Sequence, residues 1–555
     1  MMKMPTVNFD KTEFISLLGK SVDDQTLSER ISMIGTDLEK VDPEIVVEVF
    51  PDRPDMLSIE GFTNAMKGFM GIEEGPIEFN VHNSTYKGAV DPKVKSVRPF
   101  AVGAIVKEIN FDDNTIRSLM QIQEKLHITH GRNRKKVAIG VHDLDKIEFP
   151  IKYTTMPRDF TFVPLEFDKT LTIDEILKIH PKGIEYAHLV SEFKECPIWI
   201  DNKGQVLSMP PIINGDHTKV TEKTKNLFID ITGTHRKSIE YALNIILMGL
   251  FIRKGEIYSF KLSDEGKELT YPNLNREKIE LDISYSNKIL GLDLSEDETV
   301  NLLLKMRYGV SSKSNNKVIV EIPPYRADII HPIDLVEDIS IAYGFENFVP
   351  EIPDIATIGQ ENPIEIFLRK IEELMIGFNF FEVKNYILSN EDVLITKMLE
   401  NKRKLVKTRN AVNTEFDTVR CSLLPLLIKT LASNSHYEYP QNIFEVGVVV
   451  PDQSLVEKQF LSCVTCHPKA NFSEIKGILN GLLTSFGIQY SVNEDSYPYF
   501  IQGRSCSLEM EGEYIGRMGE LNPEVLYNFK LEMPVSAFEI DISKIFERFK
   551  EKIQR

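Results

Sequence analysis

Cysteine is scarce in this sequence, and long apolar runs are missing. Five cysteines among 555 residues are too few for a disulfide framework, which indicates a reducing compartment. No apolar run approaches the roughly 20 residues that a membrane helix requires. Residues 1–10 also lack the basic start and apolar stretch of a signal peptide. These absences predict a cytoplasmic protein without a membrane span.

Three motifs that carry common enzymatic chemistry are also missing. The sequence contains no G-x-x-x-x-G-K-[ST] phosphate loop, no G-x-G-x-x-G after a strand and no G-x-S-x-G elbow. The formal charge of −18 argues against adhesion to nucleic acid over the whole surface, because phosphate binding requires clustered Lys and Arg. A local basic patch remains compatible with this charge.

Two of the five cysteines match the haem-attachment pattern C-x-x-C-H. They are Cys463 and Cys466, followed by His467, in a stretch that alternates like a strand. Zinc would require a fourth ligand that nothing nearby offers. Two ordinary strand cysteines are therefore favoured over haem or zinc.

The length predicts three or four domains, because a single core stops growing near ~250–300 residues. With 42% hydrophobic and 27% charged residues, the composition is that of a globular protein that folds throughout. Strand-like and helix-like segments predict an α+β multidomain chain. We place a small α/β domain over 1–90, a second domain over 91–270, a small compact one over 271–347, and an antiparallel sheet with helices over 348–555.

A densely basic turn, His130–Lys136, precedes a buried-looking strand. A solvated loop is the ordinary interpretation of such a charge run. In a strongly acidic chain, a loop that faces phosphate is equally compatible with the pattern. The local sequence favours neither interpretation over the other.

Four acids lie close together within YRADIIHPIDLVEDISIAYGF, residues 325–345. Pro332 suits a first helical turn and Gly344 a helix stop, so residues 333–343 are predicted to be helical. The acids are Asp328, Asp334, Glu337 and Asp338, and the last three share one helix face. Carboxylates so spaced repel unless a cation neutralises them, and all-oxygen coordination suits Mg²⁺. Spacing alone leaves a Mg²⁺ site and a solvated acidic face equally open.

Local pattern assigns structural roles to two other polar groups. Asp52, Arg53 and Asp55 form a proline-stiffened loop that is favoured as a salt-bridged turn. Asp230 and Thr232 follow a predicted strand and precede a helix, where helix caps are slightly favoured over a cleft.

The acidic stretch resembles the magnesium-bearing motif of the phenylalanine–tRNA ligase beta-subunit family, in which R-x-D is followed by D-L-x-E-[ED] and Y-G-[FY]. PDRPDMLSIEG resembles the amino-terminal loop of that family, HGRNRKKVAIGVHDLDKI the start of its editing domain, and RCSLLPLLIKTLASN with NIFEVG its catalytic-like domain. The motifs occur in one order over nearly the whole chain. The tRNA-binding insertion and the anticodon-binding domain of the bacterial form are missing, so the chain resembles the shorter archaeal and eukaryotic kind.

This resemblance implies a division of labour between subunits. Asp328, Asp334, Glu337 and Asp338 would bind Mg²⁺, and the domain over 348–555 would be a noncatalytic copy of a class II synthetase domain. A catalytic alpha subunit would bind ATP and phenylalanine and charge the phenylalanine tRNA within an (αβ)₂ tetramer. Arg420 and Arg517 resemble structural beta-subunit arginines, and neither matches an ATP-binding motif.

The resemblance also implies that residues 91–270 form a domain that hydrolyses mischarged tyrosyl-tRNA. Matching the family's motifs, Ser208, Asp230 and Thr232 would face the tyrosyl side chain. Glu124, Arg134 and Asn214 would lie near the ester and the terminal adenosine. The alternatives are a nonenzymatic tRNA-binding subunit whose editing site has decayed and a freestanding hydrolase of another ester.

Overall fold

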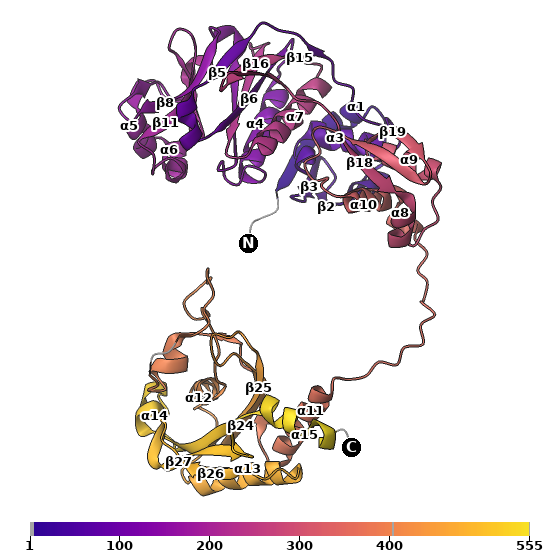
Figure 1. Cartoon of the computed structure of the whole chain (residues 1–555). Helices are drawn as coiled ribbons and strands as arrows, with labels where there is room; N and C mark the ends of the chain where they lie inside the picture. The colour runs from indigo at the N-terminus through magenta and orange to yellow at the C-terminus, as the bar shows by residue number, and fades with distance from the viewer. Residues whose placement is uncertain (1–4, 402–403, 554–555) are drawn as a thin grey trace. The chain divides into compact units, whose positions relative to one another are not determined.

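The computed structural model describes residues 5–401 and 404–553, which divide into two compact units, residues 1–352 and 353–555 (Figure 1). Helices and strands are mixed in both units, so the α+β multidomain prediction is confirmed. Within the described part of the chain, no helix is both long and apolar enough to cross a membrane.

The first unit begins with a small sheet covered by helices. The antiparallel strand order is β1 (Thr6–Asp10), β3 (Glu44–Val49), β2 (Thr36–Lys40), and the helices are α1 (Lys11–Leu18), α2 (Asp24–Met33) and α3 (Ile59–Phe69). The side chains of Asp10 and Ser58 cap α1 and α3 at their N-termini. Arg53 and Asp55 form the predicted salt-bridged turn, with their side chains 2.8 Å apart.

Two larger sheets make up the middle of the first unit. One has the order β4 (Val81–His82), β15 (Glu256–Tyr258), β6 (Phe100–Lys107), β14 (Leu227–Gly233), β7 (Val137–Asp143), and it contacts helices α4 (Asp113–Ile128) and α7 (Arg236–Ile252). The other has the order β13 (Ile213–Asn214), β12 (Val206–Met209), β11 (Glu195–Ile200), β8 (Ile151–Pro157), β5 (Lys87–Val90), β16 (Phe260–Asp264), β17 (Lys267–Tyr271). Helices α5 (Ile173–Ile179) and α6 (Pro181–Tyr186) lie in the stretch between β8 and β11.

Asp230 and Thr232 lie inside β14, so their interpretation as helix caps is wrong. The side chain that caps α7 is His235, which accepts a hydrogen bond from the Ser238 N–H. Strand β14 lies inside the sheet between β6 and β7, and its side chains are buried on both faces of the sheet.

The first unit ends in a small three-stranded sheet packed on helices. The sheet has the order β18 (Glu277–Asp282), β20 (Lys317–Ile322), β19 (Gly309–Ser314), and the helices are α8 (Ile283–Leu290), α9 (Glu296–Lys305) and α10 (Pro332–Tyr343). Helix α10 begins with Pro332 and ends before Gly344, which confirms the helix predicted over 333–343.

The second unit is built on a seven-stranded sheet. Its order is β21 (Phe381–Glu382), β24 (Gln441–Val449), β25 (Lys458–Cys466), β29 (Val535–Asp541), β28 (Glu513–Leu521), β27 (Phe500–Met510), β26 (Ser491–Glu494), antiparallel throughout except for the pairing of β21 with β24. One face packs against α11 (Pro363–Gly377), α13 (Phe472–Ser485) and α15 (Ile542–Ile553), and the other against α12 (Leu424–Ser433) and α14 (Pro523–Phe529) (Figure 1).

Cys463 and Cys466 both lie in β25, which confirms two ordinary strand cysteines. Cys463 belongs to the apolar cluster on one face of the sheet and Cys466 to the cluster on the other face. Their thiols therefore point away from each other, and they cannot share a metal ion or flank one haem.

Candidate functional site

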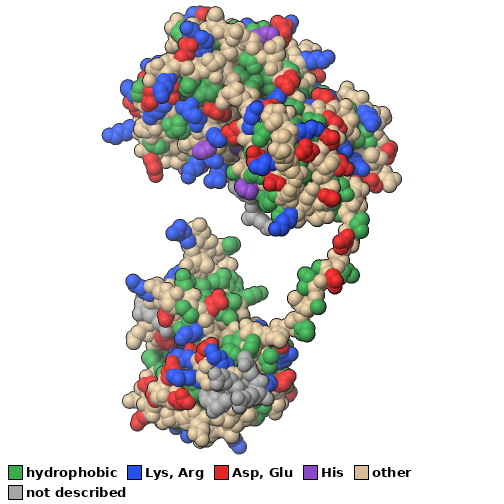
Figure 2. Space-filling model, turned by 45° about the vertical axis from the view of Figure 1, so that its right-hand side comes forward, with side chains coloured by type: hydrophobic (Ala, Val, Ile, Leu, Met, Phe, Trp, Pro, Cys, Tyr) green, Lys and Arg blue, Asp and Glu red, His purple; other side chains and the backbone are tan. Residues whose placement is uncertain are grey.

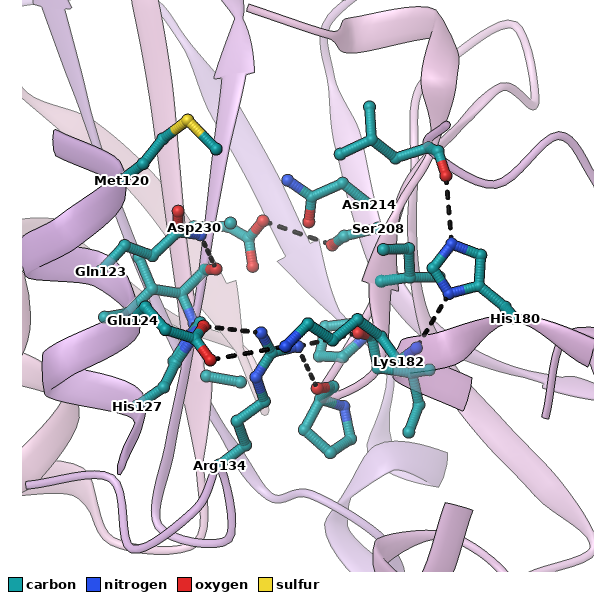
Figure 3. A pocket seen from close by; sticks show the side chains of 18 of the residues that line it. Met120, Gln123, Glu124, His127, Arg134, His180, Lys182, Ser208, Asn214 and Asp230 are labelled. Carbon is teal, nitrogen blue, oxygen red and sulfur yellow. Dashed lines mark hydrogen bonds and ion pairs between the residues drawn. The ribbon is translucent and has the colours of Figure 1, made fainter. Parts of the chain in front are cut away.

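A pocket of about 380 Å³ opens in the middle of the first unit, within the size range of small-molecule sites (Figure 3). Its walls come from helix α4, from strands β7 and β14 of the five-stranded sheet, and from the β12–β13 turn of the seven-stranded sheet. Five of the six predicted editing residues line it: Glu124, Arg134, Ser208, Asn214 and Asp230. Residues far apart in the sequence thus meet around one cavity.

The carboxylate of Asp230 lies in the pocket wall, where it is 1% exposed. The Ser208 hydroxyl donates a hydrogen bond of 3.3 Å to its Oδ2 atom, and His142 Nε2 lies 2.7 Å from the same atom. Gly140 faces Asp230 across the β14–β7 ladder, and a Cβ atom at position 140 would lie 2.2 Å from Asp230 Oδ2. The missing side chain of Gly140 is therefore what leaves room for this carboxylate.

His142 supports Asp230 from behind, because it is fully buried and does not line the pocket. Its Nδ1 atom lies 2.8 Å from the Thr218 hydroxyl, so both ring nitrogens are engaged. The sequence analysis did not assign this role to His142. The pairing of β7 with β14 could have indicated it, since that register brings position 142 beside Asp230.

A second polar group lies at the Arg134 side of the pocket (Figure 3). Arg134 donates hydrogen bonds to the carbonyl groups of Pro211 and Ile212, and its guanidinium carbon lies 4.5 Å from the centre of the Tyr186 ring. It also forms an ion pair of 3.1 Å with Glu124. The guanidinium group is thus fixed in position from several sides.

Glu124 lies between Arg134 and Lys182, whose Nζ atom is 3.5 Å from its carboxylate. The hydrogen bond from His127 and the charge of Arg134 hold the pKa of Glu124 well below its ordinary range. Burial lowers the pKa of His127 to about 4, so this ring is neutral near pH 7. Its Nε2 accepts the Ile139 N–H at 2.8 Å, which leaves the proton on Nδ1 for Glu124.

The remaining predicted residues have different environments. Asn214 lines the pocket and donates a long hydrogen bond of 3.4 Å to the Val141 carbonyl. Thr232 does not line the pocket, because Arg98 covers it and donates hydrogen bonds of 2.9 Å to its hydroxyl and 2.7 Å to its carbonyl oxygen. Sequence spacing placed Thr232 beside Asp230 and could not show this buried arginine.

None of the histidines around the pocket has a free ring nitrogen. His127 and His142 are engaged as described above. His180 lines the pocket, with Nε2 3.2 Å from the Leu165 carbonyl oxygen and Nδ1 accepting the Lys182 N–H. Such a pocket offers a hydroxyl acceptor at Asp230 and fixed cations at Arg134 and Lys182, but no histidine positioned as a general base.

The four acids predicted to bind Mg²⁺ are held chiefly by an arginine. Buried Arg326 donates hydrogen bonds of 2.6 Å to Asp328 and 2.7 Å to Asp338. Although burial alone would raise it, the charge of Arg326 holds the pKa of Asp328 below its ordinary value. Asp334 accepts hydrogen bonds from two backbone N–H groups just before α10. Three of the four acids therefore have protein partners.

Glu337 is the exception, since it is exposed on α10. Partial burial and the neighbouring carboxylates, Asp338 foremost, raise its pKa. Among the described residues, no group of three or more His, Cys, Asp or Glu side chains is arranged to hold a metal ion. In this arrangement the four acids do not fit a Mg²⁺ chelate, and the signal that sequence reasoning passed over is Arg326, two residues before Asp328.

In the second unit the two arginines examined in the sequence are also paired internally. Arg420 forms a buried ion pair with Glu445. Arg517 forms one with Glu539, whose carboxylate also accepts a hydrogen bond of 2.9 Å from the Ser422 hydroxyl. Both guanidinium groups form ion pairs with carboxylates on strands of the same sheet.

Family models match three parts of the chain. Residues 93–246 match the B3/4 domain, residues 279–345 the tRNA synthetase B5 domain, and residues 349–542 the CLM domain of the phenylalanyl-tRNA synthetase beta chain.

Curated relatives match over almost the full length. The phenylalanine–tRNA ligase beta subunit of Archaeoglobus fulgidus is 42% identical, covering 98% of this chain and 99% of that protein. The one from Methanococcus aeolicus is 41% identical, covering 97% and 100%. A solved amino-terminal fragment of the phenylalanyl-tRNA synthetase beta subunit from Pyrococcus horikoshii is 36% identical and covers 61% of this chain and 99% of that one, with a TM-score of 0.59.

Proposed function

Because the chain belongs to the family of phenylalanine–tRNA ligase beta subunits, we propose that it works with a catalytic alpha subunit and itself hydrolyses mischarged tyrosyl-tRNA. In this proposal the alpha subunit binds ATP and phenylalanine, and the two chains form an (αβ)₂ tetramer. The beta chain supports the charging of the phenylalanine tRNA and removes tyrosine attached in error.

The second unit is proposed to be a noncatalytic partner of the alpha subunit. A synthetase site must present cations to the ATP phosphates. Arg420 and Arg517 are instead neutralised by Glu445 and Glu539 inside the sheet. These pairings support a structural role for both arginines.

Deacylation of tyrosyl-tRNA is needed because a largely apolar phenylalanine site rejects an added hydroxyl only weakly, by about a hundredfold. A second site that binds the phenol group can remove the error. The observation that carries our proposal is the Asp230 carboxylate in the pocket wall, opposite Gly140, where it can accept a hydrogen bond from the tyrosine hydroxyl. Phenylalanine, which lacks the hydroxyl, cannot make this bond.

The attacking group in this proposal is water. Ser208 donates its hydrogen bond to Asp230, and the surrounding histidines are engaged, so the pocket presents no activated nucleophile. The side chains described above would orient the ester and its terminal adenosine toward that water.

The same engaged histidines favour one alternative, a tRNA-binding subunit without hydrolytic activity. The two functions are separated by measuring the loss of tyrosyl-tRNA with the αβ complex and with the alpha subunit alone. Clearance that depends on the beta chain supports deacylation. Persistence of tyrosyl-tRNA in the presence of a charging-competent complex supports the alternative.

The partnership is tested by tRNA charging with phenylalanine and ATP. We expect no charging by this chain alone and charging after it is mixed with the alpha subunit of the same source. Charging by the chain alone would contradict a noncatalytic second unit. Mg²⁺ enters no step of the proposal, because Asp328 and Asp338 already share an ion pair with Arg326. The binding of Mg²⁺ by the four acids stays a prediction.

A further inference from the structure

Residues Gly131–Lys136 of the basic turn have a rigid backbone. Three consecutive residues, Arg132, Asn133 and Arg134, have left-handed backbones with φ of 49°, 51° and 63°. This conformation is uncommon for residues other than glycine and persists only where the surroundings hold it. All six N–H groups of the turn donate hydrogen bonds to backbone carbonyl groups. The side chains of the turn therefore start from a fixed backbone.

Three of the four Lys and Arg residues of the turn differ in their exposure. Arg134 points inward, where it is 9% exposed and lines the pocket. Arg132 and Lys135, on either side of it in the chain, are exposed. Neither forms an ion pair with any described residue. On the face of the first unit that Figure 2 shows, basic and acidic side chains are largely interspersed.

Lys182 lies on the opposite wall of the pocket, at the start of α6. It reaches Glu124 at 3.5 Å and Glu185 at 3.2 Å, and it is 36% exposed. Figure 3 shows the contacts of the Glu124 carboxylate with both Arg134 and Lys182. Arg134 also carries a buried Nε atom without a hydrogen-bond partner in the described structure. Cations thus approach this part of the pocket from both walls.

We infer that Arg132 and Lys135 on the basic turn, together with Lys182, form a track that binds the phosphates of the single-stranded 3′ end of the tRNA. The inference rests on the proposed hydrolysis of tyrosyl-tRNA. If the tyrosyl group lies near Asp230, the phosphates that precede the terminal adenosine must extend out of the pocket. Grooves of fixed cations are the usual means by which proteins bind single-stranded backbones.

The rigidity of the turn gives this track a physical advantage. Long basic side chains lose rotamer entropy when they bind, but a fixed backbone adds no further ordering cost. Glu124 keeps Arg134 and Lys182 in place before RNA arrives, because it is ionised and contacts both. The acidic remainder of the chain repels RNA, which favours binding at this one place.

The test uses the αβ complex and a fluorescently labelled RNA stem that ends in a single-stranded ACCA 3′ end. Its affinity is measured by anisotropy at several salt concentrations for the wild type, for R132Q/K135Q and for K182Q. Each lost phosphate contact should reduce the slope of log K against log salt by about 0.7 and weaken binding roughly fourfold near 0.15 M salt. The double variant is therefore expected to bind more than tenfold more weakly, and K182R to recover much of the K182Q loss.

The charge-matched control is K223Q/K254Q, which removes two exposed lysines away from the pocket lining. It is expected to leave the salt slope nearly unchanged. Unchanged affinity and slope in both track variants, with a wild type that clears tyrosyl-tRNA, would overturn the track while leaving the proposed function intact. If the wild-type complex binds RNA through the track but does not hydrolyse tyrosyl-tRNA, the deacylation proposal is contradicted.

Discussion

The Nε2 atom of His142 lies 2.7 Å from the Oδ2 atom of Asp230, in the buried wall of the pocket. The Thr218 hydroxyl engages the other ring nitrogen of His142 at 2.8 Å. These two contacts of His142 fix where the Asp230 carboxylate points before any substrate binds. A fixed acceptor of this kind distinguishes tyrosine from phenylalanine by a single hydrogen bond.

Asp230→Asn should slow the hydrolysis of tyrosyl-tRNA. Loss of a hydrogen bond to a charged acceptor costs about 1.5–3 kcal/mol, or roughly ten- to a hundredfold in rate. Deacylation assays with preformed tyrosyl-tRNA measure this loss, and phenylalanine charging serves as the readout that should not change. The control is D159N, at an exposed position in the same unit. Equal rates of hydrolysis by the wild type and D230N would show that Asp230 does not contribute to the reaction.

Gly140→Ala should impair hydrolysis although it replaces no polar side chain. The new Cβ atom would lie 2.2 Å from Asp230 Oδ2, so the carboxylate must move. A displacement of about 1 Å can cost on the order of a hundredfold in rate. The control is G249A in helix α7, where a Cβ would meet its nearest atom at 3.7 Å. A fully active G140A variant would show that the position of Asp230 is not critical.

His127 should make the stability of the protein depend on pH. Its pKa is lowered to about 4 in the folded state against about 6.5 in the unfolded state, so the unfolded state binds more protons between these values. Stability is therefore fully present above pH 6.5 and falls by about 3 kcal/mol as the pH drops to 4.

Urea unfolding of the wild type and H127Q between pH 4 and 7 measures this contribution. The difference between the two proteins should shrink as the pH falls, while H188Q, at an exposed histidine, should follow the wild type. A difference that is constant over this range would show that His127 does not titrate as described.

Arg326→Met should destabilise the first unit strongly. It would leave Asp328 and Asp338 as buried carboxylates without a cation, and breaking a buried pair in this way costs about 3–5 kcal/mol. Urea unfolding with and without 10 mM Mg²⁺ measures the loss. From the observed pairing we expect the same loss in both conditions. Full rescue by Mg²⁺ would show that the acids can bind the metal in place of the arginine.

Glu337→Gln separates the two interpretations of the acidic helix in the wild-type background. Because partial burial and the neighbouring carboxylates raise the pKa of Glu337, removing its charge should leave stability unchanged or raise it slightly. A Mg²⁺ site would give the opposite result, a loss of stability seen only with the metal present. Calorimetric titration of Mg²⁺ into the wild type and E337Q provides the direct check.

The elements that sequence reasoning placed correctly are those with local signals. Pro332 and Gly344 delimit α10, and Arg53 pairs with Asp55, because each of these residues acts on groups only a few positions away. For Asp230, the local signals gave a wrong prediction. The same Asp that resembles a cap in sequence lies in a central strand, since pairing with β6 and β7 outweighs its local preference.

The sequence by itself determined the family and the bounds of α10, and five of the six residues assigned to the editing site line the pocket. Only the tertiary structure decided which partner each charged group takes. Arg98 covers Thr232, and Arg326 forms ion pairs with two of the four acids assigned to Mg²⁺. The physical reason is that ion pairs and buried hydrogen bonds depend on distances of a few ångströms between residues tens to hundreds of positions apart. Residue spacing carries only the local part of that information.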